Sequence, residues 1–78
     1  MVENTLNNLQ PGEKARIIKV IAKGTVRRKL MDMGLVPGSE IEVIRTAPLG
    51  DPIEFRIKGY SLSIRKQEAI NIVVDTVA

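Results

Sequence analysis

Apolar and polar residues alternate with a period of two over most of the chain, which is the pattern of half-buried β-strands. The clearest case is residues 52–59, where Ile53, Phe55 and Ile57 alternate with charged residues. Other stretches are rich in β-branched residues and are bounded by glycine or proline, as strands often are. The pattern predicts five strands, over residues 14–22, 39–47, 52–59, 60–64 and 70–74.

The alternation is interrupted at three positions within these predicted strands. The polar parity shifts between Ile17 and Ile18, and both Ile44 and Val73 are apolar where their strands should present a polar side chain. A β-bulge inserts one residue and reorients those that follow it. We therefore interpret the shift at Ile17 and Ile18 as a bulge or as a strand that is covered on both faces. We interpret Ile44 and Val73 as bulges or barrel bends, with an exposed interface as the alternative.

One segment between the first two strands has the period of a helix. Val26, Leu30 and Met33 fall at i, i+4 and i+7, which places them on one helical face. This spacing predicts a short helix over about 25–33, with Thr25 as its N-cap. A polar turn at residues 65–69 has room for about one further helical turn.

Glycines mark the end of this predicted helix and the turn after it. Gly34 stands where a left-handed C′ residue belongs, and Leu35 is then positioned to contact Leu30 in a Schellman motif. Residues 36–39, VPGS, predict a type II turn with Gly38 at the position that requires a positive φ.

Five short strands and one small helix predict a mainly β fold that closes, or nearly closes, into a barrel. Closure leaves few exposed strand edges. We expect an SH3-like five-stranded barrel with the helix between strands 1 and 2, and an OB-like barrel is the alternative. The 78 residues are enough for a single domain, 1–78. Because the chain has no cysteine, its apolar core must provide the stability.

The side-chain inventory excludes most catalytic chemistry. The chain has neither His nor Cys, which removes nucleophilic dyads and triads and thiolate metal sites. Glu40 and Glu42 share a strand face, where solvated carboxylates are the simplest interpretation. No phosphate-binding glycine motif occurs. We therefore expect a binding module without a cofactor, not an enzyme, and an oxygen-ligand metal site built from carboxylates stays open.

The net charge is mild, +3 from 12 Lys and Arg against 9 Asp and Glu. The one basic run is at residues 27–29, and a single Phe and a single Tyr provide few platforms for stacking bases. A solvated helix face explains the run most simply. The alternative is a small-barrel nucleic-acid binder that uses these cations: Arg27, Arg28, Lys29, Arg56 and Lys58.

The stretch RRKLMDMGLVPGSEIEVIRTAPLGDPIEFRIKGYSLSIRKQEAINIVV resembles the ferrous-iron transport protein A (FeoA) family. Three segments carry the resemblance, RRKLMDMGLVPGSEIEV, APLGDPIEFRIKGY and LSIRKQEAINI, and the opening LQPGEKARIIKV extends it over nearly the whole chain. The resemblance implies an SH3-like barrel and a cytoplasmic accessory role beside the membrane permease that imports ferrous iron. The cytosolic GTPase domain of that permease is the implied contact.

The same fold occurs as the C-terminal domain of metal-dependent repressors of the diphtheria-toxin-repressor type. The alternative is therefore that this chain is a free-standing relative of that repressor domain. Those chains carry an N-terminal helix-turn-helix and a dimerisation region, so a free-standing transport accessory fits this sequence better. The FeoA family is labelled as binding transition metal ions, but this sequence offers no His or Cys ligand. Nucleic acid is not an expected partner, and we expect membrane contact only through the permease.

The predicted partner-binding residues lie on the helix and on the loop over 48–52: Arg27, Met31, Leu49 and Asp51. Met31 projects about 140° around the helix from Val26, where it contacts either a partner or a neighbouring loop. Leu49 stands in a turn that two prolines stiffen. It either covers an open end of the barrel or is presented to a partner.

Overall fold

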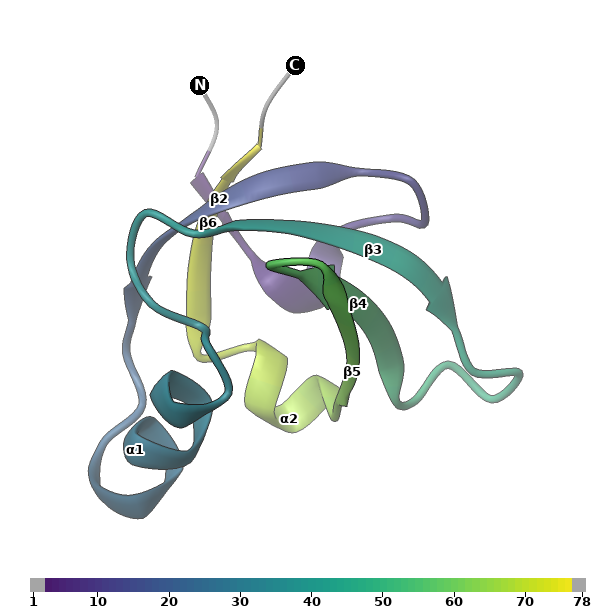
Figure 1. Cartoon of the computed structure of the whole chain (residues 1–78). Helices are drawn as coiled ribbons and strands as arrows, with labels where there is room; N and C mark the ends of the chain where they lie inside the picture. The colour runs from purple at the N-terminus through teal and green to yellow at the C-terminus, as the bar shows by residue number, and fades with distance from the viewer. Residues whose placement is uncertain (1–2, 77–78) are drawn as a thin grey trace.

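The structure, a computed structural model, describes residues 3–76, which form one antiparallel sheet curled around a single core (Figure 1). The six strands lie in the order β1-β6-β2-β3-β4-β5. In chain order the elements are β1 (Glu3–Thr5), the 3-10 helix η1 (Leu6–Asn8), β2 (Lys14–Val20), α1 (Gly24–Asp32), β3 (Glu40–Thr46), β4 (Ile53–Ile57), β5 (Tyr60–Ile64), α2 (Lys66–Ala69) and β6 (Ile72–Thr76). The mainly β prediction is confirmed, and α2 is the helical turn expected over residues 65–69.

The sheet has one strand more than the sequence pattern predicts. This additional strand, β1, pairs antiparallel with β6, with Glu3 opposite Asp75 and Thr5 opposite Val73. Its three residues are too few to show an alternation of apolar and polar side chains. The strand is therefore defined by its pairing with β6, which the local sequence does not reveal.

Two of the expected irregularities are β-bulges. The register of β2 on β6 shifts between Ile17 and Lys19, and the register of β3 on β4 shifts between Val43 and Arg45. The extra residues are Ile18 and Ile44, as the broken alternation predicts. On β6 the pairing is continuous. Val73 is half-buried within the sheet, opposite Thr5 of β1 on one side and Lys19 of β2, directly after the Ile18 bulge, on the other.

Helix α1 begins one residue before the predicted start. Its N-cap is Lys23, which is extended, and no side chain provides a cap hydrogen bond. The predicted N-cap at Thr25 is wrong because the chain turns into the helix at Gly24, whose φ of 64° is accessible mainly to glycine. Thr25 therefore lies in the first turn of the helix.

The end of α1 is the predicted Schellman motif. The Leu35 amide donates to the Leu30 carbonyl at 3.1 Å, and the Gly34 amide donates to the Met31 carbonyl at 3.0 Å. Gly34 has the positive φ that this motif requires, 94°. Leu30 and Leu35 are both fully buried. The type II turn that follows is also confirmed, since Gly38 has a positive φ and the Ser39 amide bonds to the Val36 carbonyl.

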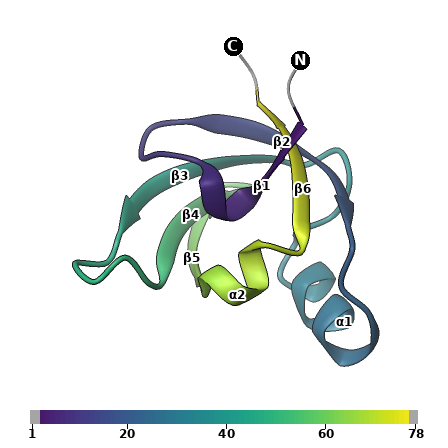
Figure 2. The same ribbon diagram turned by 180° about the vertical axis from the view of Figure 1, so that it is seen from behind.

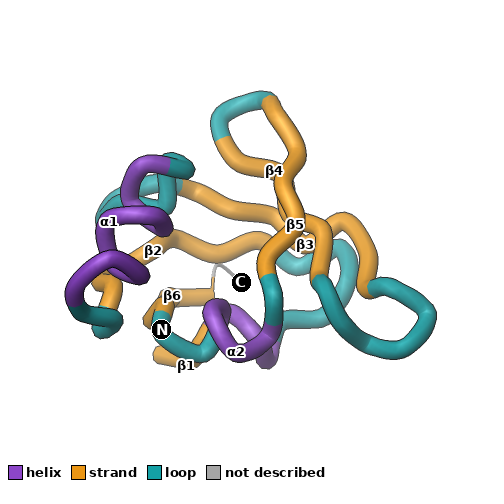
Figure 3. The backbone as a smooth tube through the Cα atoms, turned by 90° about the horizontal axis from the view of Figure 1, so that it is seen from below, coloured by secondary structure: helices purple, strands orange, loops and turns teal. Residues whose placement is uncertain are grey.

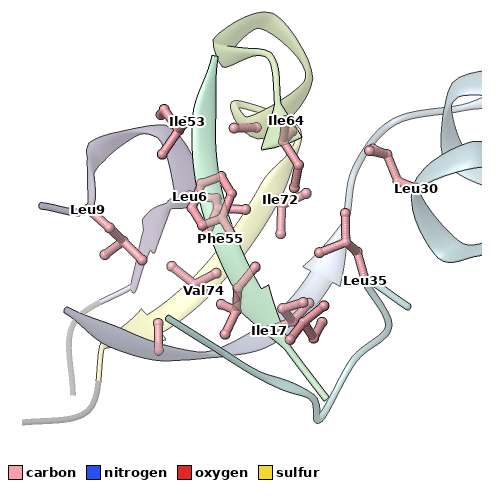
Figure 4. Packing of buried hydrophobic residues seen from close by; sticks show 14 of the residues in the cluster. Leu6, Leu9, Ile17, Leu30, Leu35, Ile53, Phe55, Ile64, Ile72 and Val74 are labelled. Atoms are coloured by element: carbon pink, nitrogen blue, oxygen red, sulfur yellow. The ribbon is translucent and has the colours of Figure 1, made fainter. Parts of the chain in front are cut away.

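The core is built mainly from the inward side chains of the strands. Ile53, Phe55 and Ile57 of β4 are all buried, which confirms the alternation predicted for residues 52–59. Figure 4 shows the Phe55 ring in the middle of the cluster, with Leu6 of η1 nearby. Ala69 of α2 is also fully buried. The two short helical turns thus contribute to the same core as the sheet.

Helix α1 and the loop between β3 and β4 lie at opposite ends of the molecule (Figures 1, 2 and 3). Helix α1 follows β2 at one end of the sheet, while the 47–52 loop projects from the far ends of β3 and β4. Within residues 3–76, neither α-helix has the length or the apolar character that spanning a membrane requires.

Candidate partner-binding surfaces

The loop over 47–52 presents Leu49 to solvent. Two backbone hydrogen bonds close this loop, from the Ala47 amide to the Pro52 carbonyl at 3.0 Å and from the Gly50 amide to the Ala47 carbonyl at 2.7 Å. Gly50 takes the positive φ expected of it, and the Asp51–Pro52 peptide bond is cis. Leu49 is 97% exposed. It therefore does not cover an end of the barrel, and that alternative is excluded.

Asp51 attaches this loop to the rest of the domain. Its Oδ1 atom accepts a hydrogen bond from the Lys66 amide at 3.0 Å, at the first residue of α2. The first amides of a helix have no partner within the helix, and a carboxylate is well suited to accept from them. In this structure Asp51 therefore orients the loop that carries Leu49.

Arg27 and Met31 lie on α1, at the other end of the molecule. The Arg27 guanidinium donates from Nη1 to the Val20 carbonyl at 2.9 Å and so ties the helix to the end of β2. Met31 is half-buried. Both residues border a shallow depression of about 330 Å³ on the helix, which is lined by Gly24, Arg27, Arg28, Met31 and Asp32.

Two further contacts fix the position of α1. Lys29 Nζ forms an ion pair with Glu68 Oε2 of α2 at 2.9 Å, and the Tyr60 hydroxyl donates to the Met33 carbonyl. Of the three cations at residues 27–29, Arg28 alone makes no hydrogen bond or ion pair with a described residue. Arg27 and Lys29 of this basic run thus have structural partners. Fewer of its cations are therefore available to bind the phosphates of a nucleic acid.

The four predicted partner-binding residues do not form one surface. Arg27 and Met31 are at the α1 end, and Leu49 and Asp51 are at the opposite end (Figures 1 and 3). The 27–31 and 48–52 segments are joined through β3, and a strand separates its two ends by its full length. The two pairs of residues therefore belong to two separate surfaces.

The structure also exposes apolar residues that sequence reasoning placed elsewhere. Val26 shares the Leu30 face of α1 but lies one turn further out, beyond the core, and is 39% exposed. Ile70 was predicted to begin the last strand, but it is the C-cap of α2 and is half exposed, like Ile21 after β2. No local pattern distinguishes these aliphatic residues from core residues.

The described part of the chain offers no evident metal centre. Within residues 3–76 no three or more carboxylates come close enough together to hold a metal ion. The exposed side chains of the described residues, Leu49 among them, are suited to binding through the surface.

Comparison with known proteins identifies the family. Residues 4–76 match the FeoA domain family, which covers most of the chain. The chain belongs to the FeoA family. Its fold is therefore the SH3-like barrel expected from the resemblance, and the OB-like alternative is set aside. The FeoA of Stenotrophomonas maltophilia, solved with zinc, is described as a prokaryotic SH3 domain protein; it is 28% identical, with a TM-score of 0.81 over 92% of this chain and 89% of that one.

Three further relatives differ in how much of their own length the match to this chain covers. The FeoA-like protein of Clostridium acetobutylicum is 44% identical, with a TM-score of 0.92 over 100% of this chain and 91% of that one. A Porphyromonas gingivalis fusion of Fe(2+) transport protein A with the transporter FeoB is 37% identical over 73 residues. The match covers 94% of this chain but only 9% of that relative. The repressor IdeR of T. acidophilum, 23% identical with a TM-score of 0.86 over 99% of this chain and 35% of that one, shares the fold.

Proposed function

We propose that this FeoA domain is a cytoplasmic, non-enzymatic accessory protein of ferrous-iron uptake that recognises the iron permease and its GTPase domain. The observation that carries this proposal is the P. gingivalis fusion protein, in which a FeoA segment and the transporter FeoB share one chain. Joining two modules covalently raises the effective concentration of each for the other. Such a fusion therefore supports a functional association between the corresponding separate proteins.

The Leu49 loop is the surface that we assign to the permease contact. A fully exposed leucine has no stabilising role in the isolated domain, and this one is 97% exposed. The loop bonds at Ala47 and Gly50, together with the Asp51 bond to α2, constrain this loop within the isolated domain. Preorganisation lowers the entropy lost on binding. Full burial of a leucine side chain contributes roughly 1.5–3 kcal/mol, which corresponds to about 10- to 150-fold in affinity.

Binding to the isolated cytosolic domain of the permease tests this assignment. We expect the wild-type chain to be captured in at least one guanine-nucleotide state, and Leu49→Asp to weaken capture by about 10-fold or more because a carboxylate would have to be desolvated. Ile70→Asp is the matched control, since Ile70 is also an exposed aliphatic residue but lies on α2. Circular dichroism and thermal melting check that both variants are folded.

The results of this capture assay distinguish an error in the proposed partner from an error in the proposed binding surface. If the wild-type chain is not captured with or without nucleotide, the proposed partner is wrong. If Leu49→Asp is captured as well as the wild type and sustains ferrous-iron uptake in cells, the partner holds but the Leu49 surface is wrong. Met31→Asp in the same assay tests the α1 end independently, because that end cannot reach the surface around Leu49.

A further inference from the structure

The positive charge of the chain is concentrated at the α1 end. Residues 19–31 contain five Lys and Arg and no Asp or Glu. These five cations outnumber the carboxylates of the two helices, Asp32 on α1 and Glu68 on α2, by three. Glu68 is already paired with Lys29. Asp32 is at the C-terminal end of α1, about 12 Å along the helix axis from Gly24.

Exposed aliphatic side chains gather at the same end. Among the described residues there are five exposed large hydrophobic residues, and three of them are here: Ile21, Val26 and Ile70. The Ile21 amide donates to the Asn71 carbonyl at 2.8 Å, so Ile21 lies beside the residue that follows Ile70. Val26 is on the side of α1 that the Lys29–Glu68 ion pair joins to α2. We call this surface the basic-apolar end: Ile21, Lys23, Val26, Arg27, Arg28 and Ile70.

We propose that the basic-apolar end binds the surface of an anionic lipid bilayer. Lys and Arg side chains are attracted to anionic headgroups, while neighbouring aliphatic side chains enter the boundary between headgroups and acyl chains. The six residues that define this surface are aliphatic or basic, and Asp32 is the one carboxylate that lines the depression beside Arg27 and Arg28. An excess of cations beside exposed aliphatic side chains is the combination that binds the surface of an anionic bilayer. This differs from the expectation that the chain reaches a membrane only through its partner.

The position of this end is compatible with a simultaneous protein contact. The basic-apolar end is at α1 and at Ile70, the C-cap of α2, whereas the loop that carries Leu49 contacts the first residue of α2 and projects away from α1 (Figures 1 and 3). A domain resting on the bilayer through α1 would therefore present Leu49 away from the lipid. The proposal does not depend on the assignment of Leu49 to the permease.

Vesicle flotation with the full chain tests the electrostatic part. We expect binding to vesicles of phosphatidylcholine mixed with phosphatidylglycerol, none to phosphatidylcholine alone, and release at about 1 M salt, where the screening length is about 3 Å. Each unit of charge near an anionic surface changes binding by about 5-fold, so Arg28→Glu should weaken it by about 25-fold. The matched control is Lys58→Glu, which makes the same charge change at the exposed β4–β5 turn and should retain most of the binding.

A single-tryptophan pair tests the apolar part, because the native chain has no tryptophan. In Ile70→Trp, the emission should shift to the blue when anionic vesicles are added, since the indole leaves water. In Leu49→Trp, at the opposite end, the emission should stay as it is in buffer. A blue shift in Leu49→Trp without one in Ile70→Trp would show that the other end faces the lipid, and would overturn the proposal.

Three further results would also overturn it. The first is an absence of wild-type binding to anionic vesicles at low salt. The second is equal loss in Arg28→Glu and Lys58→Glu, which would mean that only the net charge matters. The third is a loss of permease capture in Arg28→Glu while vesicle binding stays at the wild-type level, which would make this end a protein interface.

Discussion

Replacing Gly34 with alanine should destabilise the domain through two separable effects. The backbone effect arises because Gly34 has a φ of 94° as the C′ residue of α1, where an L-residue is strained by about 1–2 kcal/mol. The steric effect arises because a Cβ added there would lie 2.8 Å from the Tyr60 hydroxyl oxygen. That hydroxyl donates to the Met33 carbonyl, so moving it aside sacrifices a hydrogen bond worth about 0.5–1.5 kcal/mol.

The sum predicts a loss of about 1.5–3.5 kcal/mol in the free energy of unfolding for Gly34→Ala. For a domain of this size, that loss lowers the melting temperature by roughly 10–20 °C. Gly38→Ala is the matched control, since Gly38 has a φ of 92° but no atom within 4 Å of the added Cβ. It should show the backbone effect alone, about 1–2 kcal/mol.

A double-mutant cycle with Tyr60→Phe isolates the steric effect. Without the hydroxyl, the nearest remaining atom to the added Cβ is the Tyr60 Cζ position at 4.0 Å, an ordinary contact. In the Tyr60→Phe background, Gly34→Ala should then lose only as much stability as Gly38→Ala. The coupling energy between Gly34→Ala and Tyr60→Phe, measured by urea unfolding, should therefore be about 1 kcal/mol. If their effects add within about 0.3–0.5 kcal/mol, the proposed clash with Tyr60 is refuted.

Three further substitutions test the core, the loop anchor and the helix contact. Phe55→Ala removes a fully buried ring and should lower the free energy of unfolding by about 3–5 kcal/mol in urea titration, whereas a loss below about 1 kcal/mol would contradict its central place in the core. Asp51→Ala should lose about 1 kcal/mol and speed hydrogen exchange at the Lys66 amide, and unchanged exchange there would show that the bond is not formed in solution. Lys29→Gln, which breaks the partly exposed ion pair with Glu68, should lose less than about 1 kcal/mol, and this difference should vanish at about 1 M salt; a loss that persists at high salt would mean that packing dominates.

Local patterns were enough to predict most of the secondary structure. The alternation of Ile53, Phe55 and Ile57 defines β4, because one face of a strand must be buried in a domain with a single core. The glycines at 34 and 38 define the end of α1 and the following turn, because each has a positive φ that other residues rarely adopt. These features depend on neighbours within a few residues, which the sequence displays directly.

Features that depend on distant pairing were not predictable in this way. β1 is a strand only because β6 lies beside it, and α1 starts at Gly24 because of how the chain leaves β2. The exposure of Val26 and Ile70 depends on where the core ends, which is set by the packing of α1 and α2 against the sheet.

By itself, the sequence of this FeoA domain indicated a small β-barrel, most strand positions, the places where the alternation breaks and the resemblance to the FeoA family. It also identified Leu49 as unusual, since a leucine between two prolines in a turn has little local reason to be apolar. Only the tertiary structure decided that Leu49 is in solvent, that Asp51 anchors its loop to α2, and that the loop and α1 face opposite ways. The physical reason is that side-chain alternation encodes which face of a strand is buried, whereas the curl of the sheet decides which residues meet on the surface.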